Sequence, residues 1–209
     1  MTYLQLCSVL HRNKVRLFTS ADIRNLFPDE NEKTVRNNLT RWLEKGYLVR
    51  LRRDVYEFVG QGAEGAAPDL YIANKLYGPS YVSLETALSF YSMIPDIAAG
   101  ITSVTTRATR TFKNRQGSFF YRTCRGAAFT GYYLLRYDGF KVCIADKEKA
   151  LVDFLYYRMR SGHAFNVGEE RLNRTMLKKI NWRRAGYYAK LFNNKVIEAL
   201  KECKEYTLC

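Results

Sequence analysis

The side chains best suited to contact another molecule gather between residues 29 and 59 of the chain. Five of them share one face of a helix predicted there: Lys33, Arg36, Asn37, Thr40 and Arg41. Arginine can form two hydrogen bonds with the edge of guanine, asparagine can do the same with adenine, and lysine attracts phosphate as a point charge. These side chains therefore indicate contact with DNA, although a solvated surface helix also presents a charged face.

The other face of this predicted helix is apolar, with the spacing i, i+4, i+7 and i+8 that one buried helix face requires. Its members are Val35, Leu39, Trp42 and Leu43. Gly46 ends the helix, and two short β-prone runs follow at residues 47–51 and 55–59. Three arginines crowd the turn region between them: Arg50, Arg52 and Arg53. Because three positive charges repel one another, their crowding favours contact with a phosphate backbone.

Two shorter helices are predicted before this segment. The first is marked by Leu4, Leu6, Val9 and Leu10. The second covers residues 21–27, with Thr19 or Ser20 as its N-cap and Asp22 as a first-turn acid. Three helices and a two-stranded hairpin are the pattern of a winged helix-turn-helix, and in helix-turn-helix folds the recognition helix enters the DNA major groove.

The composition favours binding to a polyanion by a protein with two domains. The 209 residues include 34 Lys and Arg against 20 Asp and Glu, a formal net charge of +14. Basic residues are in excess both before and after residue 59, so the second part would also contact nucleic acid or an acidic partner. Residues 60–68 are rich in Gly and Ala, which is typical of a linker. We expect a DNA-binding domain over residues 1–59, this linker, and a second domain over residues 69–209.

The sequence lacks the patterns of enzymes, metal sites and membrane proteins. His11 and His163 stand in no nucleophile pattern, and neither a Walker motif nor G-x-G-x-x-G occurs. Glu85, Asp138 and Asp146 could hold Mg²⁺ in a nuclease, but a turn and a helix cap account for the last two. The five cysteines form no C-x-x-C pair, and no signal peptide or membrane-length apolar run is present. We expect a cytoplasmic protein that is not an enzyme and has no cofactor, metal or membrane partner.

The second part predicts an α+β domain with a mostly antiparallel sheet and a helical C-terminal tail. Helices are expected at residues 69–77, at 83–90 with Ser83 as cap, and after Asp146; strands are expected at 101–106, 118–123, 132–137 and 140–144. Asp138-Gly139 predicts a tight hairpin, because both turn residues need positive φ. Arg107, Arg110, Lys113 and Arg115 are expected in a loop, and two or three tail helices break at Asn181 and at 193–194.

The second part also resembles a known family. The resemblance is carried by the segments Tyr81–Leu88 (YVSLETAL), Ile94–Pro95, Thr102–Arg107 (TSVTTR), Phe120–Arg122 (FYR) and Ala145–Asp153 (ADKEKALVD). Their order and spacing are similar to those of the AbiEi antitoxins of abortive-infection toxin-antitoxin systems. That family also places a winged helix-turn-helix in front, so the resemblance extends over residues 1–190 and leaves residues 195–209 outside.

The resemblance implies a phage-defence antitoxin with two roles. The first domain would repress its own operon by binding inverted repeats of double-stranded DNA, and the second would counter a nucleotidyltransferase-like toxin encoded beside it. A basic surface of the antitoxin domain would then comprise Arg107, Arg110, Lys113, Arg115 and Arg122. Two alternatives stay open. One is a transcriptional regulator whose second domain senses a ligand or dimerises, and the other is a metal-dependent nuclease.

Overall fold

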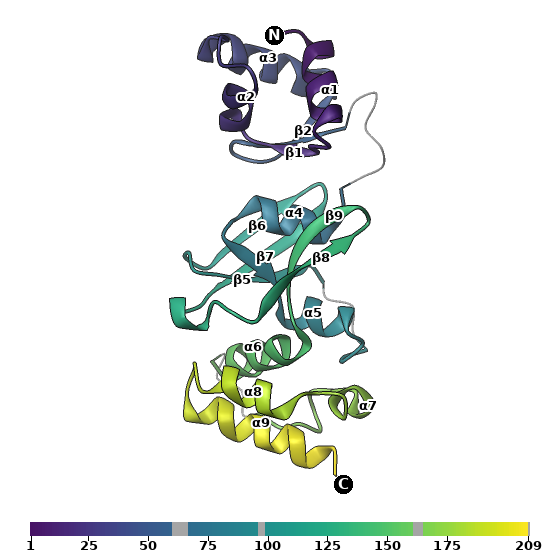
Figure 1. Ribbon diagram of the computed structural model, residues 1–209, viewed down its shortest axis with the longest axis vertical. Helices are drawn as coiled ribbons and strands as arrows, with labels where there is room; N and C mark the ends of the chain where they lie inside the picture. Colours follow the sequence, from purple (N-terminus) through teal and green to yellow (C-terminus); the bar gives the residue numbers. More distant parts are fainter. Residues whose placement is uncertain (60–66, 96–98, 161–164, 209) are drawn as a thin grey trace.

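The computed structural model describes residues 1–59, 67–95, 99–160 and 165–208. Its first part is a winged helix-turn-helix with the element order α1 (Tyr3–Arg12), β1 (Leu17–Phe18), α2 (Ser20–Leu26), α3 (Glu32–Glu44), β2 (Leu48–Arg52) and β3 (Val55–Phe58). The strands form an antiparallel sheet in the order β1-β3-β2. In Figure 1 this sheet lies between the three helices and the rest of the molecule. Residues 60–66, most of the expected linker, lie outside the described residues, as do His163 and Cys209.

The helices of the first part begin where polar side chains can cap them. Thr2 and Thr19 each form a capping box, and the predicted first-turn acid Asp22 accepts a hydrogen bond from the Thr19 N–H at 2.7 Å. The predicted apolar face of α3 is buried at Val35, Leu39 and Trp42. These three side chains pack with Leu6, Leu10, Phe18, Ile23, Leu48 and Phe58 into one small core. The predicted helix marker Leu4 lies outside it, 76% exposed.

The second part is an α+β domain built on a six-stranded mixed sheet in the order β6-β7-β5-β4-β9-β8. Its elements are α4 (Asp69–Leu76), β4 (Ser80–Val82), α5 (Leu84–Phe90), β5 (Ile101–Thr105), β6 (Arg110–Asn114), β7 (Gly117–Thr123), the 3₁₀ turn η1 (Gly126–Ala128), β8 (Tyr132–Tyr137), β9 (Phe140–Ala145), α6 (Lys147–Arg160), α7 (Arg174–Leu177), α8 (Trp182–Ala189) and α9 (Asn194–Tyr206). Three of the strand pairings are antiparallel, and β5–β7 and β4–β9 are parallel.

Layers of helices cover both faces of this sheet. The helix α4 packs on the face toward the first part, and α5 and α6 pack on the other face (Figure 1). The tail helices α8 and α9 pack on α6, so α6 is enclosed by the sheet and by the tail. The enclosure explains why α6 buries Glu148, Lys149 and Asp153 in addition to its apolar residues. No helix in the described ranges is long and apolar enough to cross a membrane.

The hairpin predicted at Asp138-Gly139 is confirmed, with φ of 46° and 80° at its two turn residues. The cap at Asp146 is also confirmed, because its carboxylate accepts the Lys149 N–H at 2.7 Å. Ser83 precedes α5 as predicted, but its side chain makes no cap hydrogen bond and instead donates to Asp153 at 2.8 Å. Asn181 and Asn193 cap α8 and α9 at the predicted breaks.

The loop predicted from Arg107 to Arg115 is wrong over most of its length. Residues 110–114 form strand β6, which pairs with β7 in an antiparallel hairpin. The strand lies at the sheet edge, where charged residues are common because they discourage pairing with other chains. Phe112, opposite Phe119, is its contribution to the core. Phe112 is the only apolar residue in this segment, so the sequence did not show the alternation of polar and apolar residues that predicts a strand.

The sheet of the first part separates two hydrophobic cores. Because successive strand residues point to opposite faces, Phe18 and Phe58 pack on the helices of their own domain. Leu17, Leu51 and Val55, on the other face, belong to the core of the second part. The contact also includes polar groups: the Asn114 side-chain amide donates to the Leu51 carbonyl at 3.2 Å. A predicted boundary between the domains at residues 60–68 is thus accompanied by direct packing of one on the other.

One buried carboxylate joins the two parts. The side chain of Glu57 on β3 is fully buried, and it accepts hydrogen bonds from Gln116 Nε2 at 2.7 Å and from the Ala67 N–H at 3.4 Å. Gln116 lies in the β6–β7 turn, so the tip of that hairpin rests on the sheet of the first part. A buried carboxylate is costly without such partners, and these hydrogen bonds therefore favour one relative placement of the two domains.

Candidate nucleic-acid interface

The predicted DNA-reading residues lie on the exposed face of α3. Lys33, Arg36, Asn37, Thr40 and Arg41 are all exposed. Asn31 is the N-cap of the helix, and its side chain accepts a hydrogen bond from the Lys33 N–H at 2.8 Å. Glu32 lies 3.5 Å from the Arg36 guanidinium, but both side chains are more than two-thirds solvent-exposed. Such an exposed pair contributes little to stability, so the guanidinium can turn to a ligand at small cost.

A groove of about 480 Å³ runs beside this face, between α2, α3 and the β2–β3 hairpin. Four arginines from these three elements line it: Arg24, Arg36, Arg50 and Arg53. Glu32 at the groove lies 3.9 Å from Arg24 as well as 3.5 Å from Arg36. The groove therefore carries a net positive charge, which attracts an anion. Arg24 was missed in the sequence, because its place in the second helix gave no sign that it would face the third.

The hairpin turn is fixed against the start of α2. Asp54, at φ 61°, accepts hydrogen bonds from the Ser20 hydroxyl and, at 3.1 Å, from the Ser20 N–H. A carboxylate at the first turn of a helix is also favoured by the helix dipole. This contact holds the turn, with Arg53, beside the helices. The wing is thus short, and it forms one wall of the groove.

The structure contradicts the expectation that Arg52 faces the same ligand as Arg50 and Arg53. A β-bulge shifts the register of β2 between residues 50 and 52. Bulges redirect side chains, and Arg52 donates from Nε to the Leu76 carbonyl at 2.5 Å while its guanidinium lies 5.9 Å from the centre of the Phe112 ring. Arg52 therefore contacts the second domain, whereas Arg50 and Arg53 line the groove.

The buried side-chain amide of Asn38 positions Arg41 on the exposed face of α3. Arg41 Nη2 donates to Asn38 Oδ1 at 2.9 Å, and Asn38 Nδ2 donates to the Met1 carbonyl at 3.1 Å. Asn38 is 9% exposed, and its position next to the apolar stripe gave no sign of this role. Arg41 is thereby oriented along α3, on the line that Asn37 occupies one turn earlier and Lys33 two turns earlier.

The basic surface predicted on the second domain is divided between two faces of the β6–β7 hairpin. Arg110 pairs with Tyr121, so it shares the face toward α4. Its guanidinium and that of Arg107 lie 6.0 and 5.4 Å from the Tyr77 ring centre. Arg122 is one residue further along β7 and points to the opposite face. Lys113 pairs with Ser118, two strand steps from Phe120, and so also lies on the face of Arg122. Arg115 lies in the turn.

Two of the segments that carry the family resemblance meet in a buried polar cluster. The Asp153 carboxylate on α6 is fully buried, and it accepts hydrogen bonds from the Tyr81 hydroxyl at 3.0 Å, the Ser83 hydroxyl at 2.8 Å and the Lys149 ammonium. Burial raises the pKa of Asp153 above its ordinary value, and the ammonium and the two hydroxyl donors oppose that rise. The cluster ties β4 and the start of α5 to α6. It consists of structural contacts and lines none of the described clefts.

Nucleophiles and metal ligands are not gathered at either surface. Among the described residues, no group of three or more His, Cys, Asp or Glu side chains could hold a metal ion. The described cysteines Cys7, Cys124, Cys143 and Cys203 are free thiols. Burial raises the pKa of the Cys124 thiol to about 11 and that of Cys203 to about 12. These two thiols are therefore protonated near neutral pH, where a thiol is a poor nucleophile.

Comparison with known proteins gives a match of fold. No protein-family model matches the sequence, and no curated protein matches it. Among solved structures, the chain is similar to the crystal structure of the RV2827C protein from Mycobacterium tuberculosis, with a TM-score of 0.62 at 13% sequence identity. The match covers 97% of this chain and 76% of the other. At this identity the likeness shows that the two chains share a fold, which extends over both parts of the molecule.

Proposed function

We propose that this chain is an AbiEi-type antitoxin, which binds DNA through its first domain and acts by binding rather than by catalysis. The observation that carries the proposal is the groove in which Arg24, Arg36, Arg50 and Arg53 converge from three elements beside the exposed polar face of α3. Guanidinium groups gathered on a winged helix-turn-helix are complementary in charge to a DNA backbone.

In this proposal α3 and the β2–β3 hairpin have different tasks. Arg36 and Asn37 read base edges in the major groove, because they project from the middle of the exposed face and can each form paired hydrogen bonds with a base. Arg50 and Arg53 on the hairpin bind the flanking phosphates. Because the turn is held by Ser20 and Asp54, these phosphate contacts fix how deeply α3 enters the groove.

Repression of its own operon is supported by the resemblance of the sequence to AbiEi antitoxins. The same resemblance supports a second role for residues 69–209, which would counter a nucleotidyltransferase-like toxin encoded by the adjacent gene. Two resembling segments, Tyr81–Leu88 and Ala145–Asp153, meet in the polar cluster of the second domain. These two segments therefore hold β4 and the start of α5 to α6.

DNA binding is tested with the full-length protein and the promoter region of its own operon. Replacing Arg36 or Asn37 with Ala should weaken binding to the operator by about 1–3 kcal/mol, and binding to shuffled DNA much less. Arg183→Ala, which removes an exposed arginine from α8, is the matched control and should change neither. An equal loss on both DNAs would show that α3 contacts phosphates alone, and unchanged affinity would refute its role.

The antitoxin role is tested separately by co-expression with the adjacent gene. The wild-type chain should restore growth of cells that express the toxin, and the Arg36→Ala variant, supplied from an unrelated promoter, should restore it equally. If the wild-type chain gave no protection while still binding its operator, the antitoxin role would be wrong. The chain would then be a transcriptional regulator without an antitoxin role.

A further inference from the structure

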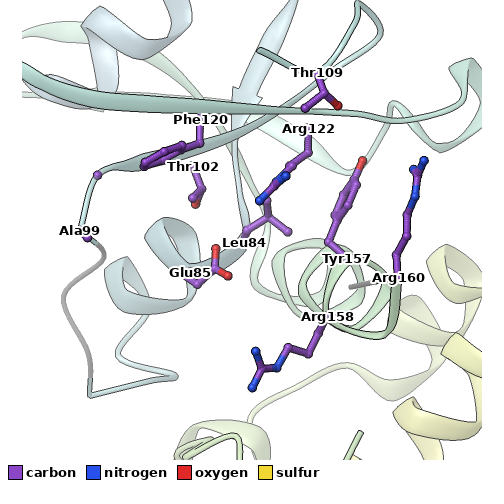
Figure 2. A pocket seen from close by; sticks show the side chains of 11 residues that line it. Leu84, Glu85, Ala99, Thr102, Thr109, Phe120, Arg122, Tyr157, Arg158 and Arg160 are labelled. Atoms are coloured by element: carbon purple, nitrogen blue, oxygen red, sulfur yellow. The ribbon is translucent and has the colours of Figure 1, made fainter. Parts of the chain in front are cut away.

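A cleft of about 650 Å³ opens on the second domain, between β7, the start of α5 and the last turns of α6. Its lining helices α5 and α6 lie on the sheet face away from the first domain (Figure 1), and it shares no lining residue with the groove beside α3. Its walls are drawn in Figure 2, where Arg122 extends from the sheet into the space between Thr102 and Tyr157. A cleft of this volume is in the range of small-molecule and cofactor sites.

The charges around the cleft are arranged for an anion. Arg122 from β7 and Arg160 from α6 both line it, are exposed, and have no hydrogen bond or ion pair with another residue in the described ranges. Arg158 lines it too, but its Nε donates to Glu170 at 2.7 Å. Three arginines and one carboxylate, Glu85, line the cleft, so its net charge is positive, and guanidinium pairs with phosphate through two parallel hydrogen bonds.

The other walls of the cleft suit an aromatic ligand. The ring of Phe120 lines it from β7, and the ring of Tyr157 lines it from α6. The hydroxyl of Tyr157 donates to the Thr123 carbonyl at 2.6 Å, which fixes the ring, and burial raises its pKa, so it stays neutral. Glu85 points into the cleft from the first turn of α5 (Figure 2) and offers a carboxylate that accepts hydrogen bonds. Flat rings, a hydrogen-bond acceptor and guanidinium groups are what recognition of a base and its phosphate requires.

Two backbone positions at the cleft have unusual local geometry. Leu84 at its floor has φ of 58°, a conformation that is uncommon for a residue other than glycine. It is held there by its neighbour Ser83, whose carbonyl accepts a hydrogen bond from the Thr102 hydroxyl at 2.7 Å. At the rim, a Cβ on Gly100 would lie 2.4 Å from the Ser118 carbonyl oxygen, so a larger residue does not fit.

We propose that this cleft binds a nucleoside phosphate, either free or as the terminal nucleotide of a strand. Arg122 and Arg160 hold the phosphate, the base packs on Phe120 or Tyr157, and Glu85 accepts a hydrogen bond from an amino group or a ribose hydroxyl. Inorganic phosphate would satisfy the guanidinium groups alone and leave the aromatic walls and Glu85 without a partner. This inference goes beyond the proposed DNA-binding and antitoxin roles and does not rest on either of them.

The test measures binding to the full-length protein by calorimetry. The probes are the four ribonucleoside monophosphates and triphosphates, the unphosphorylated nucleosides, inorganic phosphate, and short single-stranded oligonucleotides with and without a 5′-phosphate. Saturable binding of at least one nucleotide is expected, with inorganic phosphate and the nucleoside each weaker by roughly tenfold or more. Binding of the phosphorylated oligonucleotide without the free nucleotides would also support the site and would assign it to strand ends.

Variants separate this cleft from the general positive charge of the protein. Arg122→Ala and Arg160→Ala should each weaken nucleotide binding by roughly tenfold or more, since each removes a charge-assisted hydrogen bond. Arg183→Ala on α8 removes the same charge elsewhere and should leave the affinity unchanged, and Glu85→Gln should alter the preference among bases. The proposal would be overturned if neither a free nucleotide nor a 5′-phosphorylated oligonucleotide bound saturably at millimolar concentration, if inorganic phosphate bound equally well, or if Arg183→Ala caused an equal loss. Unchanged melting temperatures show that the variants are folded.

Discussion

Replacing Lys149 with Met should strongly destabilise the protein by leaving the buried Asp153 carboxylate without its cation. Both side chains are fully buried, and Asp153 would retain the hydroxyl hydrogen bonds of Tyr81 at 3.0 Å and Ser83 at 2.8 Å. Methionine fills nearly the volume of the lysine stem, so the change tests charge rather than packing. Removing one partner of a buried ion pair costs about 3–5 kcal/mol. For a chain of this length that corresponds to a fall in melting temperature of about 6–20 °C.

The destabilisation should depend on pH in a defined direction. Burial already raises the pKa of Asp153, and loss of the Lys149 ammonium, which lowers it, raises that pKa further. A carboxyl group whose folded pKa lies above its unfolded value loses stability as pH rises between those two values. The difference in stability between wild type and Lys149→Met should therefore be smaller at pH 5 than at pH 7.5.

A second substitution distinguishes this account from simple disruption of packing. Adding Asp153→Asn to Lys149→Met removes the stranded charge and keeps an acceptor for the Tyr81 and Ser83 hydroxyls, so it should restore at least about 1 kcal/mol. Thermal and urea unfolding measure these differences, and Lys201→Met on the exposed side of α9 is the control. The reasoning would be refuted if Lys149→Met cost less than about 1 kcal/mol, or if its cost were the same at both pH values.

Two further predictions concern the first domain and its contact with the second. Exchanging Arg50 and Arg53 together for Ala should weaken binding to all DNA sequences alike and flatten the salt dependence by about one unit for each lost phosphate contact. Arg52→Ala should instead lower the melting temperature and leave the salt dependence unchanged. A flatter salt dependence in Arg52→Ala, with none in the double variant, would place Arg52 on the DNA. A chain of residues 68–209 should fold around its own sheet but melt at a lower temperature than the full chain, because it loses the packing of Leu51 and the hydrogen bond from Gln116 to Glu57. Identical melting curves would show that the contact between the domains contributes nothing to the stability of the second domain.

The elements that the sequence alone determined are those governed by short-range physics. Helix caps and helical spacing located α3, and its buried residues Val35, Leu39 and Trp42 were the predicted ones. The Asp138-Gly139 hairpin was predictable because its turn needs two residues at positive φ. A winged helix-turn-helix followed by an α+β domain was therefore readable from local pattern, and the exposed basic face of α3 was readable with it.

The tertiary structure decided which face of the molecule each side chain serves. Arg52 was grouped with Arg50 and Arg53 by sequence, but a bulge in β2 turns it to the second domain. Likewise, Arg122 is separated from Arg110 by the alternation of the β6–β7 hairpin. Register and bulges depend on strand pairing, which no local window of sequence contains.

Long-range packing also created the sites that sequence patterns did not indicate. Arg24 joins the groove of α3 through the packing of α2, and Arg160 of α6 lines the same cleft as Arg122 of β7. Ser83 was predicted as a helix cap and is instead a partner of Asp153, since the enclosed helix α6 offers a buried carboxylate that needs donors. The sequence thus determined the elements and their exposed charges, and the tertiary structure determined which charges meet, because such contacts join residues far apart in the chain.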